Sequence, residues 1–216
     1  MKKQTSKTYL IVNEIFNATT HGIATGLAIA GMILLILKGV HNSSPIEVVS
    51  FTIYGAMLVL LFLFSTLHHS LYFSRAHKVF QVFDHAGIFL LIAGTYTPYC
   101  LITLNGWIGW TILSIVWPCA ILGIVFTAIF LPRAKQVPKF STVLYVVMGW
   151  LILLAFLPLY HLLTATGFWL LVAGGVIYTV GALIYRYKFF FSHVLWHIFV
   201  LVAAMLIWFS IYFYVG

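Results

Sequence analysis

The chain has 216 residues, of which 63% are hydrophobic and only 6% are charged. Soluble domains usually contain about 25% charged residues, so this composition excludes a protein that folds in water alone. The net charge of +8 does not indicate a nucleic-acid partner, because the basic residues lie in short connections between apolar stretches and form no basic run with interleaved aromatic residues.

Seven apolar stretches follow one another along the chain, each close to the roughly 20 residues that a helix needs to cross a bilayer. Long unbroken apolar runs are typical of membrane helices, whereas a β-barrel shows short segments of alternating hydrophobicity. The sequence therefore predicts an all-α polytopic membrane protein, with seven transmembrane helices bundled into a single domain over residues 1–216. The expected spans are 17–37, 48–68, 83–104, 108–130, 141–160, 167–185 and 191–213.

Basic residues are distributed unequally between the two sides of this predicted bundle. Ten of the eleven Lys and Arg residues fall at the amino end or in the second, fourth and sixth connections, and Lys38 alone falls on the opposite side. Because Lys and Arg accumulate in cytoplasmic loops, we expect the amino terminus in the cytoplasm and the carboxyl terminus outside. The ten are Lys2, Lys3, Lys7, Arg75, Lys78, Arg133, Lys135, Lys139, Arg186 and Lys188.

Polar side chains within the expected spans gather on the predicted cytoplasmic side. Four segments that are far apart in sequence bring them to one layer, whereas chance placement would scatter them over both leaflets. Ionisable side chains are costly in a bilayer, so a cluster of them usually marks a functional site. They are Glu14, Asn17 and His21 at the first span, Ser65, His68 and His69 in the second, Asp84 and His85 in the third, and Ser192, His193 and His197 in the seventh.

Three histidines of this layer form a candidate metal site. His193 and His197 are four residues apart and share a helix face, so both can bind one metal ion. His69 supplies a third imidazole, and Ser65 lies on the same helix face as His69. Three imidazoles beside a carboxylate, Asp84, suggest zinc with one open coordination position, although copper, iron and nickel also bind imidazole.

The other histidines allow simpler interpretations. A single histidine at a membrane interface is usually a satisfied or snorkelling residue, so the metal interpretation depends on the whole group at matching depth. His68 points about 100° away from His69 and can replace it as a ligand if the helix is rotated. Solvated roles are favoured for His41 and His161 in expected outer loops and for His77 in an inner loop.

Five motifs together cover most of the chain. They are Glu14-x-x-Asn17-x-x-x-His21, Ser65-x-x-x-His69, Asp84-His85, Ala93-Gly94-Thr95-Tyr96-Thr97-Pro98 and Ser192-His193-x-x-x-His197. This combination resembles the bacterial haemolysin III family, which belongs with the progestin and adipoQ receptors and more distantly with the alkaline ceramidases.

The resemblance implies a seven-helix bundle in the bacterial plasma membrane with a cytoplasmic amino end. It also implies that His69, His193 and His197 are zinc ligands, that Asp84 holds the zinc-bound water and that Ser65 lies in the surrounding shell. At the position of His68 the resemblance leads us to expect an aromatic residue such as Tyr.

The first functional hypothesis is a zinc-dependent hydrolase whose substrate is a membrane lipid with an amide or ester bond. Zinc lowers the pKa of a bound water towards about 7. Asp84 would act as general base and then general acid, and Ser65 would orient His69 or the water. Glu14 would offset the positive charge that neutral ligands leave on zinc.

Two alternatives do not involve catalysis. In the first, zinc is structural and fixes the helices of a receptor-like or lipid-sensing bundle. Structural zinc sites are usually closed by four protein ligands, so three histidines favour a catalytic site. In the second, the protein is a pore-forming, cytolytic haemolysin. The sequence has no long charged stripe to line such a pore, which counts against that activity.

Overall fold

The fold is seen in a computed structural model that describes residues 6–133, 139–187 and 189–216. Within these ranges, seven helical spans are long and apolar enough to cross a membrane, which confirms the predicted all-α membrane bundle. The helices are α1 (Lys7–His41), α2 (Pro45–Ser70), α3 (His77–Pro98), α4 (Gly106–Phe130), α5 (Lys139–Trp150), α6 (Phe156–Leu162), α7 (Ala165–Arg186) and α8 (Ser192–Tyr214).

The first helix is longer than expected, because it begins at Lys7 rather than at residue 17. Ser6 caps its amino end, where the side chain accepts a hydrogen bond from the Tyr9 amide at 3.1 Å. The additional turns contain Glu14, which is buried against the rest of the bundle. A polar residue is tolerated in this apolar setting because the structure gives it a partner, described below.

The third and fifth spans are not continuous α-helices. The third continues beyond Pro98 as a π-helix, η1 (Tyr99–Leu104), and the fifth consists of α5, a 3-10 segment η3 (Leu151–Ala155) and α6. Pro158 removes a backbone donor and clashes with the carbonyl four residues earlier, which disfavours α-helix across η3. The Tyr96 hydroxyl supplies hydrogen-bond partners for backbone groups at this break. It accepts a hydrogen bond from the Ile152 amide at 2.6 Å and donates one to the Met148 carbonyl at 2.7 Å.

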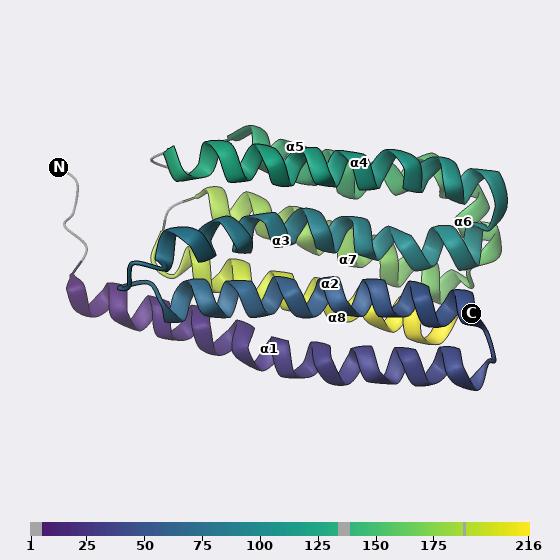
Figure 1. The fold of residues 1–216 in the computed structure, drawn as a ribbon, viewed down its shortest axis with the longest axis horizontal. Helices are drawn as coiled ribbons and strands as arrows, with labels where there is room; N and C mark the ends of the chain where they lie inside the picture. The colour runs from purple at the N-terminus through teal and green to yellow at the C-terminus, as the bar shows by residue number, and fades with distance from the viewer. Residues whose placement is uncertain (1–5, 134–138, 188) are drawn as a thin grey trace.

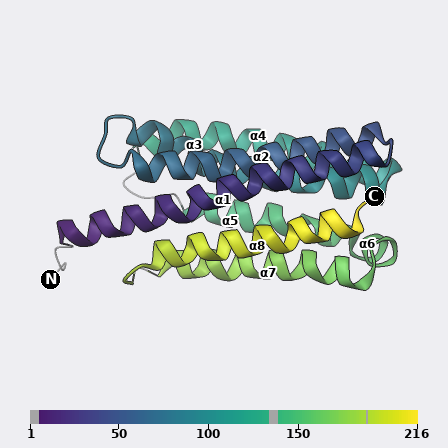
Figure 2. The same cartoon turned by 90° about the horizontal axis from the view of Figure 1, so that it is seen from below.

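The spans form a closed ring in chain order. Helices α2, α3 and α4 lie on one side of the bundle and α7 and α8 on the other (Figure 2). Each span contacts the next along the chain, and α8 returns to contact α1. This ring encloses the interior into which the polar residues of α1, α2, α3 and α8 point.

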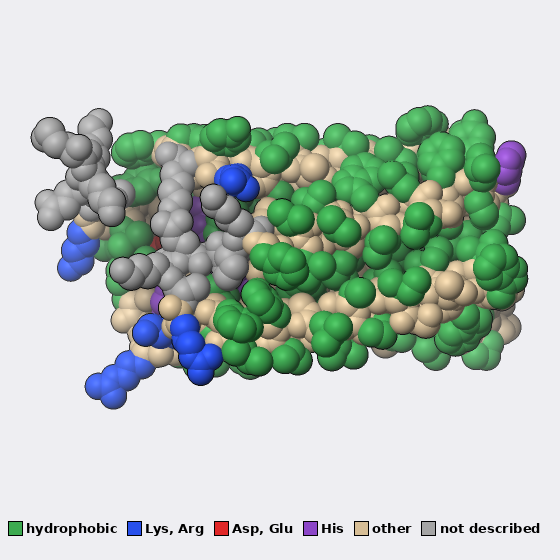
Figure 3. Space-filling model, turned by 90° about the horizontal axis from the view of Figure 1, so that it is seen from above, with side chains coloured by type: hydrophobic (Ala, Val, Ile, Leu, Met, Phe, Trp, Pro, Cys, Tyr) green, Lys and Arg blue, Asp and Glu red, His purple; other side chains and the backbone are tan. Residues whose placement is uncertain are grey.

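The two ends of the bundle differ in charge. The chain begins at one end and finishes at the other (Figure 1), and basic side chains gather at the end where α1 begins (Figure 3). The orientation in the membrane remains a prediction from this distribution. Among the residues that support it, Lys2, Lys3, Lys135 and Lys188 lie outside the described ranges.

Candidate metal centre

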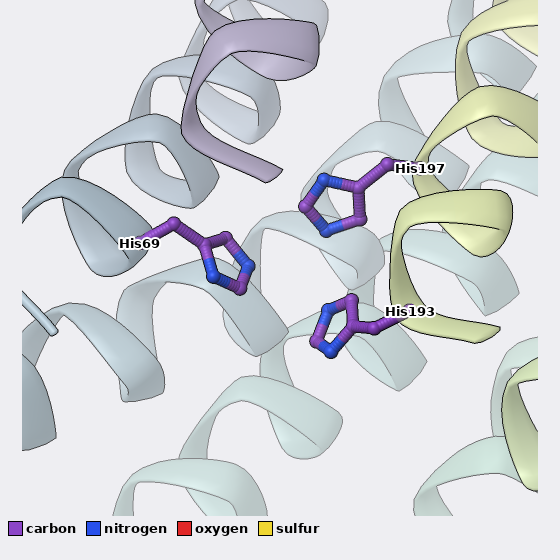
Figure 4. A group of neighbouring side chains, drawn as sticks. All are labelled: His69, His193 and His197. Carbon is purple, nitrogen blue, oxygen red and sulfur yellow. The ribbon is translucent and has the colours of Figure 1, made fainter. Parts of the chain in front are cut away.

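Three histidines from two distant segments converge inside the bundle. His69 lies near the end of α2, and His193 and His197 lie in the first turns of α8 (Figure 4). Their ring centroids are 4.8–4.9 Å apart in each pair. One ligand nitrogen from each ring lies within 4.8 Å of the other two. The topology thus brings together the three imidazoles that the sequence singled out.

The start of α8 is fixed by the first helix. Phe191, the residue before α8, has a left-handed backbone with φ of +58°, a conformation that is costly for a bulky residue. Its amide donates a hydrogen bond to the Tyr9 hydroxyl at 3.0 Å. The Tyr9 ring also packs against Phe190 and Phe191. These contacts hold the turn that places His193 two residues further on.

Helix α1 supplies partners for two of the three histidines. A carboxylate oxygen of Glu14 lies 2.6 Å from Nδ1 of His69, and the backbone carbonyl of Asn17 lies 3.3 Å from Nδ1 of His197. His21 stacks on His197 with ring centroids 3.7 Å apart. The face of α1 that carries Glu14, Asn17 and His21 therefore lies against the histidines of α2 and α8.

This arrangement fits a zinc ion. Metal-bound histidines almost always direct their second nitrogen at a carboxylate, a carbonyl or water, as His69 and His197 do here. The Nε2 atom of His69 is buried and has no hydrogen-bond partner within the described residues. A tetrahedral ion with 2.0–2.1 Å bonds to nitrogen separates its ligands by roughly 3.4 Å, so the ligand atoms, which lie within 4.8 Å of one another, have to approach one another slightly to bind it.

Asp84 lies near His69, and Ser65 precedes His69 by one turn of α2. A carboxylate oxygen of Asp84, from α3, lies within 4.8 Å of ligand atoms of His68 and His69. Ser65 is buried, and its hydroxyl has no partner in the part of the chain that the structure describes. We expected Ser65 to orient His69 or a water, but it is the Glu14 carboxylate that holds the second nitrogen of His69.

The remaining histidines at this end take different positions. His68 stacks on His77 with centroids 4.6 Å apart, so His77 joins the cluster although sequence reasoning favoured a solvated role. The short connection 71–76 could have indicated this contact, because it keeps the last turn of α2, which contains His68, close to the first residue of α3, His77. His85 belongs to neither ligand group of the described residues but lines the same cavity as Asp84, and its Nδ1 lies 2.9 Å from the Gln81 carbonyl of its own helix.

Outside the spans, Tyr72 borders this cluster. Its ring meets His77 edge-on at 4.5 Å. Burial raises the pKa of the Tyr72 phenol, and the Glu14 carboxylate raises it further. The hydroxyl therefore stays protonated at neutral pH and is able to donate a hydrogen bond.

A long apolar cavity leads away from the histidines. Its empty volume is about 1600 Å³, including the part that opens outside the bundle, and its polar end is lined by Asp84, His193 and His197. Along α7 it extends from Tyr185 to Phe168, a distance of about 25 Å at 1.5 Å per residue. Apolar side chains line most of this length, so the cavity suits a hydrocarbon chain with a polar group at the histidine end.

Comparison with known proteins agrees with this architecture. The family model described as "Haemolysin-III related" matches residues 9–208. The chain belongs to the haemolysin III family. The match confirms the predicted family and identifies the chain as a multi-pass membrane protein.

Relatives of this haemolysin III protein occur in bacteria and animals. It is 47% identical to "Hemolysin-3" of Bacillus cereus over 215 residues, covering 99% of the chain and 97% of the relative. It is 43% identical to "Hemolysin-3 homolog" of Bacillus subtilis (strain 168), with 95% and 96% covered. The human "Monocyte to macrophage differentiation factor" is 27% identical, with 92% of this chain and 82% of the relative covered.

Proposed function

We propose that this protein is a zinc-dependent hydrolase that cleaves an amide or ester bond of a membrane lipid. The observation that carries the proposal is the meeting of two features at one place. His193, His197 and Asp84 line the polar end of a long apolar cavity, and His69 lies within reach of the same ion as His193 and His197. A hydrolase for lipids needs both a hydrolytic centre and a place for the chain.

His69, His193 and His197 would hold the zinc ion, with Glu14 fixing the orientation of His69. A bound zinc ion lowers the pKa of its water towards about 7 and so supplies a nucleophile at neutral pH. Three protein ligands are typical of catalytic sites, whereas structural sites usually have four. The Glu14 carboxylate also balances part of the charge that three neutral imidazoles leave uncompensated.

Asp84 would move the proton of the reaction. Its carboxylate lies within 4.8 Å of a ligand atom of His69 and lines the cavity, so it can accept the proton of the attacking water. The same group then returns the proton to the leaving oxygen or nitrogen, as a general base that becomes a general acid. The Ser65 hydroxyl, which has no partner among the described residues, is available to orient the water.

The cavity indicates the substrate class. One leaflet of a bilayer has about 15 Å of hydrocarbon, half of the 30 Å core, so a cavity of about 25 Å along α7 accommodates an extended acyl chain. The scissile carbonyl of a lipid lies between head group and chain, which matches the junction of polar and apolar linings. A membrane lipid is therefore the substrate that we propose.

The experiment compares full-length protein with the Asp84→Asn variant in proteoliposomes that contain both amide-linked and ester-linked lipids. Released fatty acid is measured by mass spectrometry, and zinc by elemental analysis. We expect Asp84→Asn to keep its zinc and to lose turnover by about 10²–10⁴-fold, the usual contribution of general acid–base catalysis. Glu47→Gln, at the opposite end of α2, is the matched control and keeps both.

Each other result supports a different function. Zinc without any fatty-acid release in the unmodified protein contradicts the hydrolase and supports the structural zinc site of a receptor-like bundle. Conductance across a planar bilayer supports the pore-forming alternative suggested by the names of the bacterial relatives. We expect no conductance, because apolar side chains line most of the cavity.

A further inference from the structure

A second group of potential metal ligands lies beside the histidine trio. His68, His69 and Asp84 each place one ligand atom within 4.8 Å of the other two. His68 is only 5% exposed, and its Nδ1 has no hydrogen-bond partner within the described part of the chain. Leaving a buried imidazole nitrogen without a partner costs free energy. Nδ1 of His68 is therefore suited to bind a ligand such as a metal ion.

The two groups share His69, and this limits how they can be filled. Glu14 lies 2.6 Å from Nδ1 of His69 and occupies that nitrogen. Only Nε2 is left to bind a cation, and it has no partner among the described residues. One nitrogen binds one ion at a time. The two groups are therefore alternative positions for a single ion.

Histidine rings connect the second group with the end of the bundle. His77 is half-buried at the first residue of α3, directly after the connection 71–76. Its ring centroid lies 4.6 Å from that of His68, which lies 4.7 Å from that of His69. The next step, to His193, is 4.9 Å. Imidazole nitrogen binds zinc and other divalent transition metals, so these rings form an uninterrupted series of donors from the bundle end to the trio.

We propose that His68 and Asp84, together with His69, form a transfer position through which a divalent metal ion reaches the trio. The ion first binds His68, Asp84 and His69. His193 and His197 then replace His68 and Asp84, while His69 remains bound throughout. The transfer leaves Asp84 free for proton transfer, and release of the ion follows the same route in reverse. This inference rests on the metal centre of the proposed function and not on hydrolysis.

The experiment measures the rate of metal loading. Full-length protein in detergent is stripped with a chelator and mixed rapidly with Zn²⁺, and a fluorescent zinc indicator follows the uptake. His68→Phe keeps a ring of similar shape but removes both nitrogens. We expect its loading rate to fall by about tenfold, the effect of raising the barrier to metal entry by about 1.4 kcal/mol. Its release rate falls by the same factor, so the affinity and the final zinc content are unchanged.

Two further variants accompany His68→Phe. His77→Phe removes the outer ring of the series and slows loading in the same direction. It serves as the second test if His68→Phe fails to fold, which circular dichroism and size-exclusion chromatography reveal. His161→Gln is the matched control, because His161 is exposed at the opposite end of the bundle and belongs to neither ligand group of the described residues. We expect it to load at the unmodified rate.

The contradicting results are distinct from one another. Equal loading rates in unmodified protein, His68→Phe and His77→Phe overturn the transfer position. Two zinc ions per chain, or a lower zinc affinity in His68→Phe, also overturn it, because His68 would then be a permanent ligand. If the unmodified protein binds no zinc, the metal centre of the proposed function fails as well. Absence of lipid turnover with normal loading contradicts the hydrolase alone.

Discussion

At the end of the bundle where α1 begins, histidine nitrogens and a serine hydroxyl have no partners within the described residues, whereas at the opposite end the charged side chains of Lys38 and Glu47 are paired. The Ser65 hydroxyl and Nε2 of His69 belong to the first kind within the described residues. At the other end, Lys38 Nζ donates to the carbonyls of Tyr212 and Val215 at 2.8 and 2.6 Å. Unsatisfied groups are suited to bind a ligand, and satisfied groups stabilise the fold.

The two glutamates repeat this contrast. Glu14 has one oxygen against a ligand histidine at 2.6 Å. Glu47 accepts a hydrogen bond from the Asn42 side chain at 2.8 Å, in the connection that joins α1 to α2. Some isolated hydroxyls toward the Glu47 end of the bundle, such as that of Tyr54, also lack partners among the described residues. The described residues form no group of potential metal ligands at that end. The same residue type thus supports a site at one end and a turn at the other.

The largest difference in zinc affinity is expected between two variants, each of which replaces one of the two glutamates with glutamine. Glu14→Gln removes the charged partner of His69, so zinc affinity falls by about 10–100-fold, as is usual for groups that orient metal ligands. Glu47→Gln leaves the affinity unchanged because Glu47 lies at the other end. Competition with a chelating indicator measures both. Equal loss of affinity in the two variants would mean that the ends are not independent.

Replacement of Lys38 tests the satisfied end. Lys38→Met removes two charge-assisted hydrogen bonds to the last carbonyls of α8, and we expect a loss of stability on the order of 2 kcal/mol. Thermal unfolding in detergent, followed by intrinsic fluorescence, measures the change. Zinc content stays at the unmodified level. Loss of zinc together with stability would contradict the assignment of a purely structural role to this end.

A pair of glycine variants tests the packing between the ends. An added Cβ at Gly174 of α7 would lie 2.5 Å from Cγ1 of Ile207 in α8, whereas at Gly26 of α1 it would meet nothing within 4 Å. Gly174→Ala should therefore destabilise the bundle by about 1 kcal/mol or more. Gly26→Ala should stabilise it by about 0.4–1 kcal/mol. The same unfolding assay compares them, and similar shifts in both would show that α7 and α8 have room to separate.

Sequence reasoning succeeded where periodicity and topology decide the outcome. Long apolar runs predicted the seven spans, and the four-residue spacing of His193 and His197 placed both on one face of α8. The antiparallel course of the spans placed His69 and Asp84 in the same layer. The structure agrees with these predictions because they depend on helix geometry and on the order of the spans, and not on the details of side-chain packing.

Contacts that depend on helix rotation and tertiary packing were not predictable in this way. Sequence spacing suggested that Ser65 orients His69 or a water, and α1 packs so that Glu14 reaches Nδ1 of His69; a role of Ser65 toward a water stays a prediction. His77 was expected in a solvated loop, and its stacking on His68 follows from how α3 begins. The break of the fifth span arises from Pro158 and from the hydroxyl of Tyr96, which lies on another helix.

Elemental analysis of metal in the purified protein tests the central claim most directly. We predict about one zinc ion per chain in the unmodified protein, as expected for three imidazole ligands around one ion. The same content is expected in His161→Ala, which alters an exposed histidine at the far end of the bundle. The double variant His193→Ala and His197→Ala should contain almost none. Zinc far below one per chain in the unmodified protein, or unchanged zinc in the double variant, would contradict the account.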